Sequence, residues 1–154
     1  MEESKESLIY NYVCSRCFKQ IDKCECDMKP YHPLYWVDVN IQEPVRILNE
    51  KGYHTKFSCE GHCSGDELYL TFSNKHSFKK NGNVPTDFWC SSDGKTLRYK
   101  YPKKITEAEF EEDKKKHIGI LTEWCKSLPD DKEMKEIKEK YLAYIDKDRM
   151  SDMK

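Results

Sequence analysis

The sequence predicts an α+β fold: an antiparallel or mixed sheet with a short crossover helix, a hairpin and two C-terminal helices, preceded by a zinc knuckle. Three observations lead to this prediction. Four cysteines stand close together near the start, segments with strand periodicity fill the middle, and two amphipathic helical patterns follow. The length of 154 residues fits one domain of ordinary size. We divide the chain into a cysteine-rich knuckle (1–30), an α+β domain (31–128) and a C-terminal helix (129–154).

Composition narrows the class of protein. Charged residues make up 36% of the chain and apolar residues 37%, so part of it should be solvated helix rather than core. We see no apolar leader and no apolar run long enough to cross a membrane, and we therefore expect a cytoplasmic protein without a membrane partner. In that compartment eight cysteines indicate metal binding or thiol chemistry rather than a disulfide framework.

The segment YVCSRCFKQIDKCECD is the predicted knuckle, with its thiols at Cys14, Cys17, Cys24 and Cys26. A C-x2-C pair lets two thiolates reach one tetrahedral ion, and the C-x-C pair supplies two more. The residues between the pairs bury too little surface to fix the loop, so bound Zn²⁺ would supply the ordering free energy. Four thiolates leave no open position, which indicates a structural metal. An iron-sulfur centre, redox or disulfide use, and free thiols are the alternatives.

The first strand and the crossover helix follow the knuckle. Pro30 and Pro33 oppose helix, and the aromatic and β-branched residues after them favour a strand over 34–40. In QEPVRILNEKGY, Pro44 stands in a first helical turn and Gly52 just past the last turn. We therefore expect a short amphipathic helix between two strands.

Two alternating segments and a hairpin complete the predicted sheet. Alternation in YHTKFSC and ELYLTFS places two sets of side chains on one side of each strand: Tyr53, Thr55, Phe57 and Cys59 in the first, and Leu68, Leu70 and Phe72 in the second. Further along, Asp93-Gly94 separates two alternating runs, and this dipeptide suits a type I′ hairpin turn.

Two helices are expected at the C-terminal end. Thr106 and Glu109 fit a capping box, so the first helix should begin near Glu107. Pro129 ends it, and Asp130 can cap the second helix. The apolar stripe of that second helix is narrow: Met134, Ile137, Tyr141, Tyr144 and Ile145. Such a stripe packs on this domain or on a second copy of the chain, so a homodimer through this helix is one expectation.

The turn after the third predicted strand carries the densest group of reactive side chains: Ser58, Cys59, Glu60, His62 and Cys63. Three interpretations stay open. Cys59 could be a nucleophile with His62 as its base. Alternatively, Cys59, His62 and Cys63 could hold a second metal with Cys90 or His76. In the third interpretation Cys59 is a small core residue, the glycines make the turn and His62 hydrogen-bonds locally.

The run RILNEKGYHTKFSCEGH...ELYLTF, preceded by CxxC...CxC and YWVDV, resembles a group of small uncharacterised bacterial and phage-encoded proteins. These share the pattern Leu-Asn-x-Lys-Gly-Tyr-x-Thr-x-Phe-Ser-Cys-x-Gly-His, and the resemblance covers about residues 12–73. It makes Cys59, Gly61 and His62 signature positions and implies no particular reaction. Ser58-Cys59-x-Gly61 is also similar to a short motif of the tRNA wybutosine-synthesis methyltransferase family, from which we carry over no chemistry.

Residues 75–104 combine basic and aromatic side chains, with eight Lys or Arg against two acidic residues. The aromatic members are Phe78, Phe88, Trp89, Tyr99 and Tyr101. One face of the hairpin can be core while Lys95, Arg98 and Lys100 offer cations to a phosphate backbone and rings stack on bases. The alternative is an ordinary solvated hairpin, because edge strands often carry Lys to prevent edge pairing.

These patterns predict a small zinc-stabilised binding module for nucleic acid or a protein partner. The alternative is an enzyme that uses the turn from Cys59 through Glu60 and Gly61 to His62 as a thiol site or a second metal site. His117, on the apolar face of the first C-terminal helix, is interpreted as a satisfied, partly buried side chain rather than a ligand.

Overall fold

A computed structural model describes residues 10–14, 17, 19, 23–26, 34–73 and 83–152 of the chain. The fold is α+β, as the sequence predicts. The larger sheet has four antiparallel strands in the order β3 (Thr55–Cys59), β4 (Glu67–Phe72), β6 (Thr96–Lys100) and β5 (Trp89–Cys90). A smaller antiparallel sheet pairs β1 (Tyr10–Cys14) with β2 (Leu34–Asp38). Strand β1 was not among the predicted elements, and its pairing with β2 joins the knuckle to the body of the protein.

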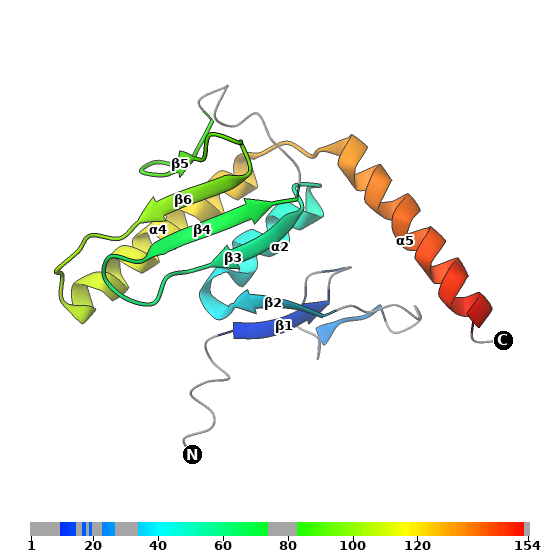
Figure 1. Cartoon of the computed structure of the whole chain (residues 1–154), viewed down its shortest axis with the longest axis horizontal. Helices are drawn as coiled ribbons and strands as arrows, with labels where there is room; N and C mark the ends of the chain where they lie inside the picture. Colours follow the sequence, from blue (N-terminus) through cyan, green and yellow to red (C-terminus); the bar gives the residue numbers. More distant parts are fainter. Residues whose placement is uncertain are drawn as a thin grey trace, which may run out of the picture.

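Two helices cover one face of the four-stranded sheet. Helices α2 (Gln42–Glu50) and α4 (Glu107–Ser127) lie behind the sheet in Figure 1, and a short 3-10 turn, η2 (Val39–Ile41), leads into α2. The core between the layers is formed by buried apolar side chains, among them Val45, Leu48, Leu68, Leu70, Phe72, Leu97, Phe110, Leu121 and Trp124. No helix or strand of the described residues covers the opposite face of this sheet.

Helix α2 ends where the sequence predicts. Gly52 adopts a φ of +97°, and its N–H donates to the carbonyl of Asn49 at 3.2 Å. The N–H of Tyr53 donates to the carbonyl of Leu48 at 2.8 Å, which completes a Schellman motif. A Cβ atom at Gly52 would lie 2.5 Å from the carbonyl oxygen of Asp131, so glycine is required there for space as well as for conformation.

A β-bulge in β3 reverses the predicted alternation. Thr55 pairs with Phe72 and Phe57 with Thr71, which leaves Lys56 as the extra residue. Thr55 is therefore buried toward the helices, whereas the Phe57 side chain is 57% exposed. The prediction that Phe57 and Cys59 share a face with Thr55 is wrong, because one extra residue moves every later side chain to the other face.

Two local predictions are also wrong in detail. The hairpin between β5 and β6 is confirmed, but only Gly94 of the Asp93-Gly94 pair has a positive φ, so the turn is not type I′. The N–H of Gly94 instead closes the turn onto the carbonyl of Ser91 at 3.0 Å. The second C-terminal helix is capped by Asp131 rather than Asp130: its Oδ1 accepts the N–H of Met134 at 3.1 Å.

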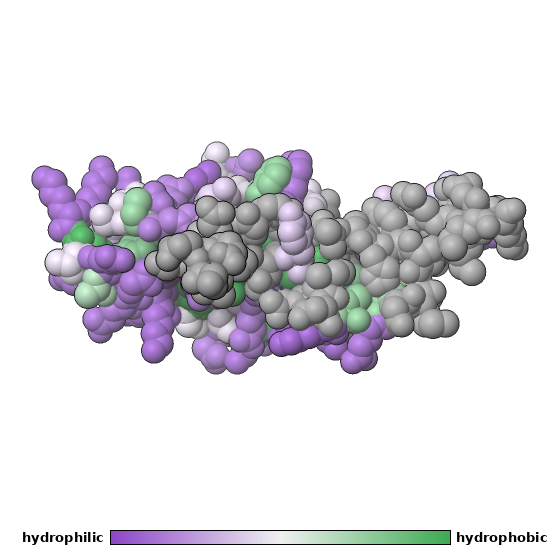
Figure 2. Space-filling model, turned by 90° about the horizontal axis from the view of Figure 1, so that it is seen from below, coloured by the Kyte–Doolittle hydropathy of each residue, from purple (hydrophilic) through white to green (hydrophobic). Residues whose placement is uncertain are grey.

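The two C-terminal helices differ in their surroundings. The capping box of α4 is present, and one side of the helix is buried through Phe110, His117, Leu121 and Trp124. Helix α5 (Lys132–Asp152) runs away from the body of the protein in Figure 1, and Ile137, Tyr141 and Tyr144 are exposed on it. In the view of Figure 2 the coloured surface is mostly hydrophilic with scattered apolar atoms. No described helix has the length and apolar content to cross a membrane.

Candidate functional site

The four cysteines of the predicted knuckle come together in the structure. The sulfur atoms of Cys14, Cys17, Cys24 and Cys26 all lie within 4.8 Å of one another. Cys14 ends β1 and is buried, and its N–H donates to the carbonyl of Lys19 at 3.0 Å, which closes the first turn. This cluster can hold a metal ion, as the spacing predicts.

The knuckle thiols differ in acidity. The N–H of Cys26 donates to the sulfur of Cys24 at 3.3 Å and lowers the pKa of Cys24. Burial raises the pKa of Cys17, and it raises that of Cys26 to about 12. A bound cation would favour all four thiolates, because a thiol that coordinates a metal ion is deprotonated and releases its proton to solvent.

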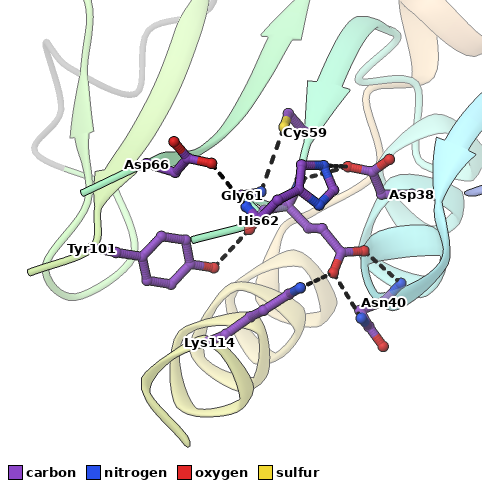
Figure 3. Close-up of polar contacts among 9 residues, drawn as sticks. Asp38, Asn40, Cys59, Gly61, His62, Asp66, Tyr101 and Lys114 are labelled. Carbon is purple, nitrogen blue, oxygen red and sulfur yellow. Dashed lines mark hydrogen bonds and ion pairs between the residues drawn. The ribbon is translucent and has the colours of Figure 1, made fainter. Parts of the chain in front are cut away.

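Backbone hydrogen bonds fix the turn after β3 (Figure 3). The N–H of Glu60 donates to Oδ2 of Asp38 at 2.9 Å, the N–H of Gly61 to the sulfur of Cys59 at 3.5 Å, and the N–H of His62 to Oδ2 of Asp66 at 3.0 Å. Three consecutive donors are thus satisfied by side chains. The turn is a defined structure rather than an open loop.

Gly61 makes this turn sterically feasible. It has a φ of +82°, and a Cβ atom there would lie 2.4 Å from the ring of Tyr101. The Tyr101 hydroxyl donates to the carbonyl of Glu60 at 2.7 Å and holds the turn against β6. Gly61 and Tyr101 together therefore fix the course of the backbone between Cys59 and His62.

Asp38 joins Cys59 and His62. The ligand atoms of the three side chains lie within 4.8 Å of one another, and Nε2 of His62 is 3.5 Å from Oδ2 of Asp38 (Figure 3). The other expected partners do not join this group: Cys63 is exposed beside Asp66, and Cys90 lies on β5, at the opposite edge of the sheet. His76 falls outside the described residues. Sequence reasoning missed Asp38, whose only signal was its place at the end of the YWVDV strand.

Glu60 points away from Cys59 and His62. Its side chain is buried, forms an ion pair with Lys114 of α4 and accepts hydrogen bonds from Asn40 N and Nδ2 at 3.0 and 2.7 Å. Asn40 and Lys114 line a cavity of about 440 Å³, whereas His62 lines a separate one of about 300 Å³ at the start of α4. Among the described cavities, Cys59, Glu60 and His62 do not share one concavity. Glu60 anchors the turn to the helix.

The environment of Cys59 does not favour a thiolate nucleophile. Burial raises the pKa of the Cys59 thiol, and the nearby carboxylates of Asp38 and Asp66 raise it further, against the opposing hydrogen bond from Gly61. A catalytic cysteine requires the opposite shift. His62 lies close to Asp38. A carboxylate therefore stands next to both the expected nucleophile, Cys59, and its expected base, His62.

The uncovered face of the sheet carries the basic and aromatic side chains. Strand registers place Cys59, Tyr69, Arg98 and Trp89 in one row across β3, β4, β6 and β5. Phe57 lies on the same face, next to the row. We call Phe57, Tyr69, Trp89 and Arg98 the open-face set. Phe57 is 57% exposed, Trp89 44% exposed and Tyr69 half-buried.

The other residues of the predicted basic hairpin are divided between surface and core. Lys95 lies exposed in the turn before β6, and Lys100 lies exposed at the end of β6. Arg98 forms an ion pair with Glu67 at 2.5 Å. Phe88, Tyr99 and Tyr101 are buried in the core, and Phe78 falls outside the described residues.

His117 is a buried, satisfied side chain, as expected. Its Nε2 lies 2.9 Å from Oδ2 of Asp87 and its Nδ1 lies 2.9 Å from the carbonyl of Asp113. Its ring stacks on Tyr99 with centroids 3.7 Å apart. These contacts tie α4 to β6 and to the segment before β5.

Comparison of the chain with protein-family models, with curated proteins and with solved structures finds no match. Its function is therefore inferred from the arrangement of its own residues.

Proposed function

We propose that this chain is a zinc-stabilised protein that binds single-stranded nucleic acid on the uncovered face of its four-stranded sheet. One observation carries the proposal. Phe57, Tyr69 and Trp89 lie with Arg98 on the face that no described helix or strand covers. Aromatic rings next to a guanidinium on an open sheet offer bases a stacking surface and a phosphate a cation.

The exposed aromatic side chains require an explanation other than core packing. Phe57 and Trp89 keep about half of their surface in water, although the opposite face of the same strands is packed against helices. Lysine on an edge strand prevents edge pairing, but an exposed tryptophan does not serve that purpose. By analogy, four-stranded RNA-binding sheets stack two or three bases on aromatic side chains of such a face. Each stacked base contributes about 1–3 kcal/mol.

Two lysines lie on the same strands as the open-face set. Lys56 is the bulged residue of β3, and its Nζ lies 5.4 Å from the centroid of the Phe57 ring. Lys100 is exposed on β6. Glu67, which pairs with Arg98, is the acidic side chain on these strands. Among the charged side chains of β3, β4 and β6, three cations therefore stand against one carboxylate, although the whole chain carries a net charge of −1. Contacts with phosphates would make binding weaken as salt concentration rises.

The role that we propose for Zn²⁺ at Cys14, Cys17, Cys24 and Cys26 is structural. Four thiolate ligands complete a tetrahedral shell and leave no position for a water molecule or substrate. Cys14 ends β1, and β1 pairs with β2, so the ion would fix the smaller sheet rather than take part in chemistry. A protein partner on the open face is the competing proposal, and nucleic acid is preferred because cations and flat rings are combined there.

Fluorescence anisotropy of a labelled mixed-sequence 12-nucleotide single strand tests the proposal. At low salt we expect the full chain to bind the single strand, and Trp89→Ala to weaken binding by about 5- to 150-fold, because a base can no longer stack on the indole ring. Tyr144→Ala is the matched control, since that ring is 70% exposed on α5, away from the sheet, and its removal should leave binding unchanged.

Charge variants provide an independent measure. Lys95→Ala, Arg98→Ala and Lys100→Ala together should make the negative slope of log affinity against log salt shallower by about 0.7 for each phosphate that is no longer neutralised. Absence of binding to both single strand and duplex at low salt would contradict the proposal. Equal weakening of binding in Trp89→Ala and Tyr144→Ala would show that the nucleic acid does not bind specifically on the sheet face.

A further inference from the structure

We propose that Asp38, Cys59 and His62 form a second metal site, for Zn²⁺ or a chemically similar divalent ion, with one coordination position left for water or a ligand. This site is separate from the four-cysteine knuckle and does not depend on nucleic-acid binding. It combines a carboxylate oxygen, a thiol sulfur and an imidazole nitrogen within 4.8 Å of one another.

The separation between His62 and Asp38 matches that of two ligands around a tetrahedral ion. Zn²⁺ binds imidazole nitrogen and carboxylate oxygen at about 2.0–2.2 Å, so two such ligands at tetrahedral angles stand about 3.4 Å apart. Nε2 of His62 and Oδ2 of Asp38 are 3.5 Å apart. The ligand atom of Cys59 lies within 4.8 Å of those of Asp38 and His62 and completes a triangle of donor atoms.

The donor atoms come from elements that the fold holds in place. Asp38 ends β2, Cys59 ends β3, and His62 follows the turn that Gly61 makes feasible. Oδ2 of Asp38 accepts the N–H of Glu60 at 2.9 Å, and the sulfur of Cys59 accepts the N–H of Gly61 at 3.5 Å. Hydrogen bonds of this kind to the ligand atoms orient them and tune their affinity for a metal.

The chemistry of the donor set favours zinc over magnesium or calcium. Thiolate and imidazole are ligands of Zn²⁺ and its neighbours, whereas Mg²⁺ and Ca²⁺ prefer oxygen ligands alone. Cys59 as thiolate and Asp38 as carboxylate would together balance the charge of a divalent ion. Three protein ligands with a free fourth position are the arrangement of catalytic zinc sites, in contrast to the closed knuckle.

The site is accessible from solvent on one side. The His62 side chain is 49% exposed and that of Asp38 15% exposed, so an ion and a water molecule can enter beside the imidazole. Cys59 pairs with Tyr69 and stands at the β3 end of the row that contains Arg98 and Trp89. A bound ion would therefore lie at the edge of the open face.

Zinc content of the full chain tests this proposal. After equilibration with Zn²⁺ and removal of free metal, native mass spectrometry should show two zinc ions per parent chain. His62→Ala and Cys59→Ser should each retain one, with the second ion bound more than about 100-fold more weakly, since even changes outside the ligand shell cost about 10- to 100-fold. Cys63→Ser is the matched control, an exposed neighbouring thiol, and should retain two.

Two further variants keep the outcome interpretable. His62→Gln preserves the size of a half-exposed side chain and should fold like the parent while binding one zinc. Cys17→Ser should lose the knuckle zinc and keep the zinc at Asp38, Cys59 and His62, which separates the two sites. One zinc per parent chain at saturating Zn²⁺, or two zinc ions in both His62→Gln and Cys59→Ser, would overturn the proposal.

Discussion

At the scale of single residues, Glu60 and Lys114 fix the turn that presents Cys59 and His62. Both side chains are less than a tenth exposed, and they form an ion pair between the turn and α4. A buried pair contributes little net stability, but removal of one partner leaves an uncompensated charge. The role of the ion pair is therefore to position the turn relative to α4.

A double-variant cycle measures this role. Lys114→Met alone should lower the free energy of unfolding by about 3–5 kcal/mol, because Glu60 would stay buried without its cation. Adding Glu60→Gln should restore much of this stability, since the amide oxygen can still accept from Asn40. Urea denaturation provides the measurement, and a cost below about 1 kcal/mol for Lys114→Met would show that water reaches the pair.

Buried phenols predict an alkaline limit to stability. Burial raises the pKa of Tyr53, Tyr99 and Tyr101, and a hydrogen bond to Asp113 raises that of Tyr99 further. The folded pKa exceeds the unfolded value of about 10, so the contribution of these groups is complete below pH 10 and is lost as pH rises above it. Unfolding free energy should fall between about pH 9.5 and 11, less steeply in Tyr99→Phe. Exposed Tyr141→Phe should match the parent, and equal slopes in all three would contradict the assignment.

The sequence predicted the position of some site residues and not of others. The four knuckle cysteines are found from spacing because their separation in the chain limits their separation in space. Asp38 could not be found, since it meets His62 only through the packing of β2 beside β3. Glu60 was grouped with its neighbours, but adjacent residues in an extended chain point in opposite directions.

At the scale of elements, the knuckle and β1 depend on each other. Cys14 is the last residue of β1 and one of the four clustered thiols, and β1 pairs with β2 alone. An isolated two-stranded sheet is marginally stable in water. We therefore propose that a bound ion would stabilise the described residues of the knuckle as much as strand pairing does.

Metal removal should release this part of the chain first. A strong chelator, or Cys17→Ser, should make the knuckle segment sensitive to a protease while residues 34–73 and 83–128 stay resistant, because the main core lies between the four-stranded sheet and its helices. Limited proteolysis followed by mass spectrometry identifies the cut sites. A variant with serine at all four cysteines that resists the protease as well as the parent does would refute a structural metal.

Helix α5 exposes a stripe of Ile137, Tyr141 and Tyr144. The helix also has six basic and six acidic residues, so two copies can pair without net repulsion. That a second copy of the chain covers this stripe stays a prediction. Light scattering after size exclusion should show a dimer of the parent and a monomer of Ile137→Lys with Tyr141→Lys. Trp89→Ala, on the sheet face, should stay dimeric, and a monomeric parent at high micromolar concentration would refute the pairing.

Element boundaries follow from local chemistry better than strand faces do. Gly52 ends α2, and Thr106 and Glu109 form the capping box at the start of α4. These residue types favour helix ends for local reasons, and the structure confirms both predicted ends. The bulge at Lys56 has no local signal of this kind, and it reverses the faces of Phe57 and Cys59. A prediction from alternation alone places Phe57 on the core face with Thr55. The open face would then lack one of its aromatic rings.

At the scale of the whole molecule, the fold class was predictable and the division into two sheets was not. Aromatic and β-branched residues predict a strand over 34–40, and the structure has β2 at Leu34–Asp38. Its partner is β1, which was not predicted, and this pairing depends on contacts between distant segments. The same division creates the junction between β2 and β3 where Asp38 meets the turn. The antiparallel sheet with helices on one face leaves its other face free for a ligand, as far as the described residues show.

Mapping the contact between the protein and a nucleic acid tests the central claim most directly. A single strand carrying photoreactive uridine analogues would be cross-linked to the full chain and the modified peptides identified by mass spectrometry. We expect the cross-links to fall on Phe57, Tyr69 and Trp89, from three strands of one sheet face, and to disappear as salt concentration rises. Cross-links confined to the exposed tyrosines of α5, or none at low salt, would contradict a nucleic-acid site on the open face.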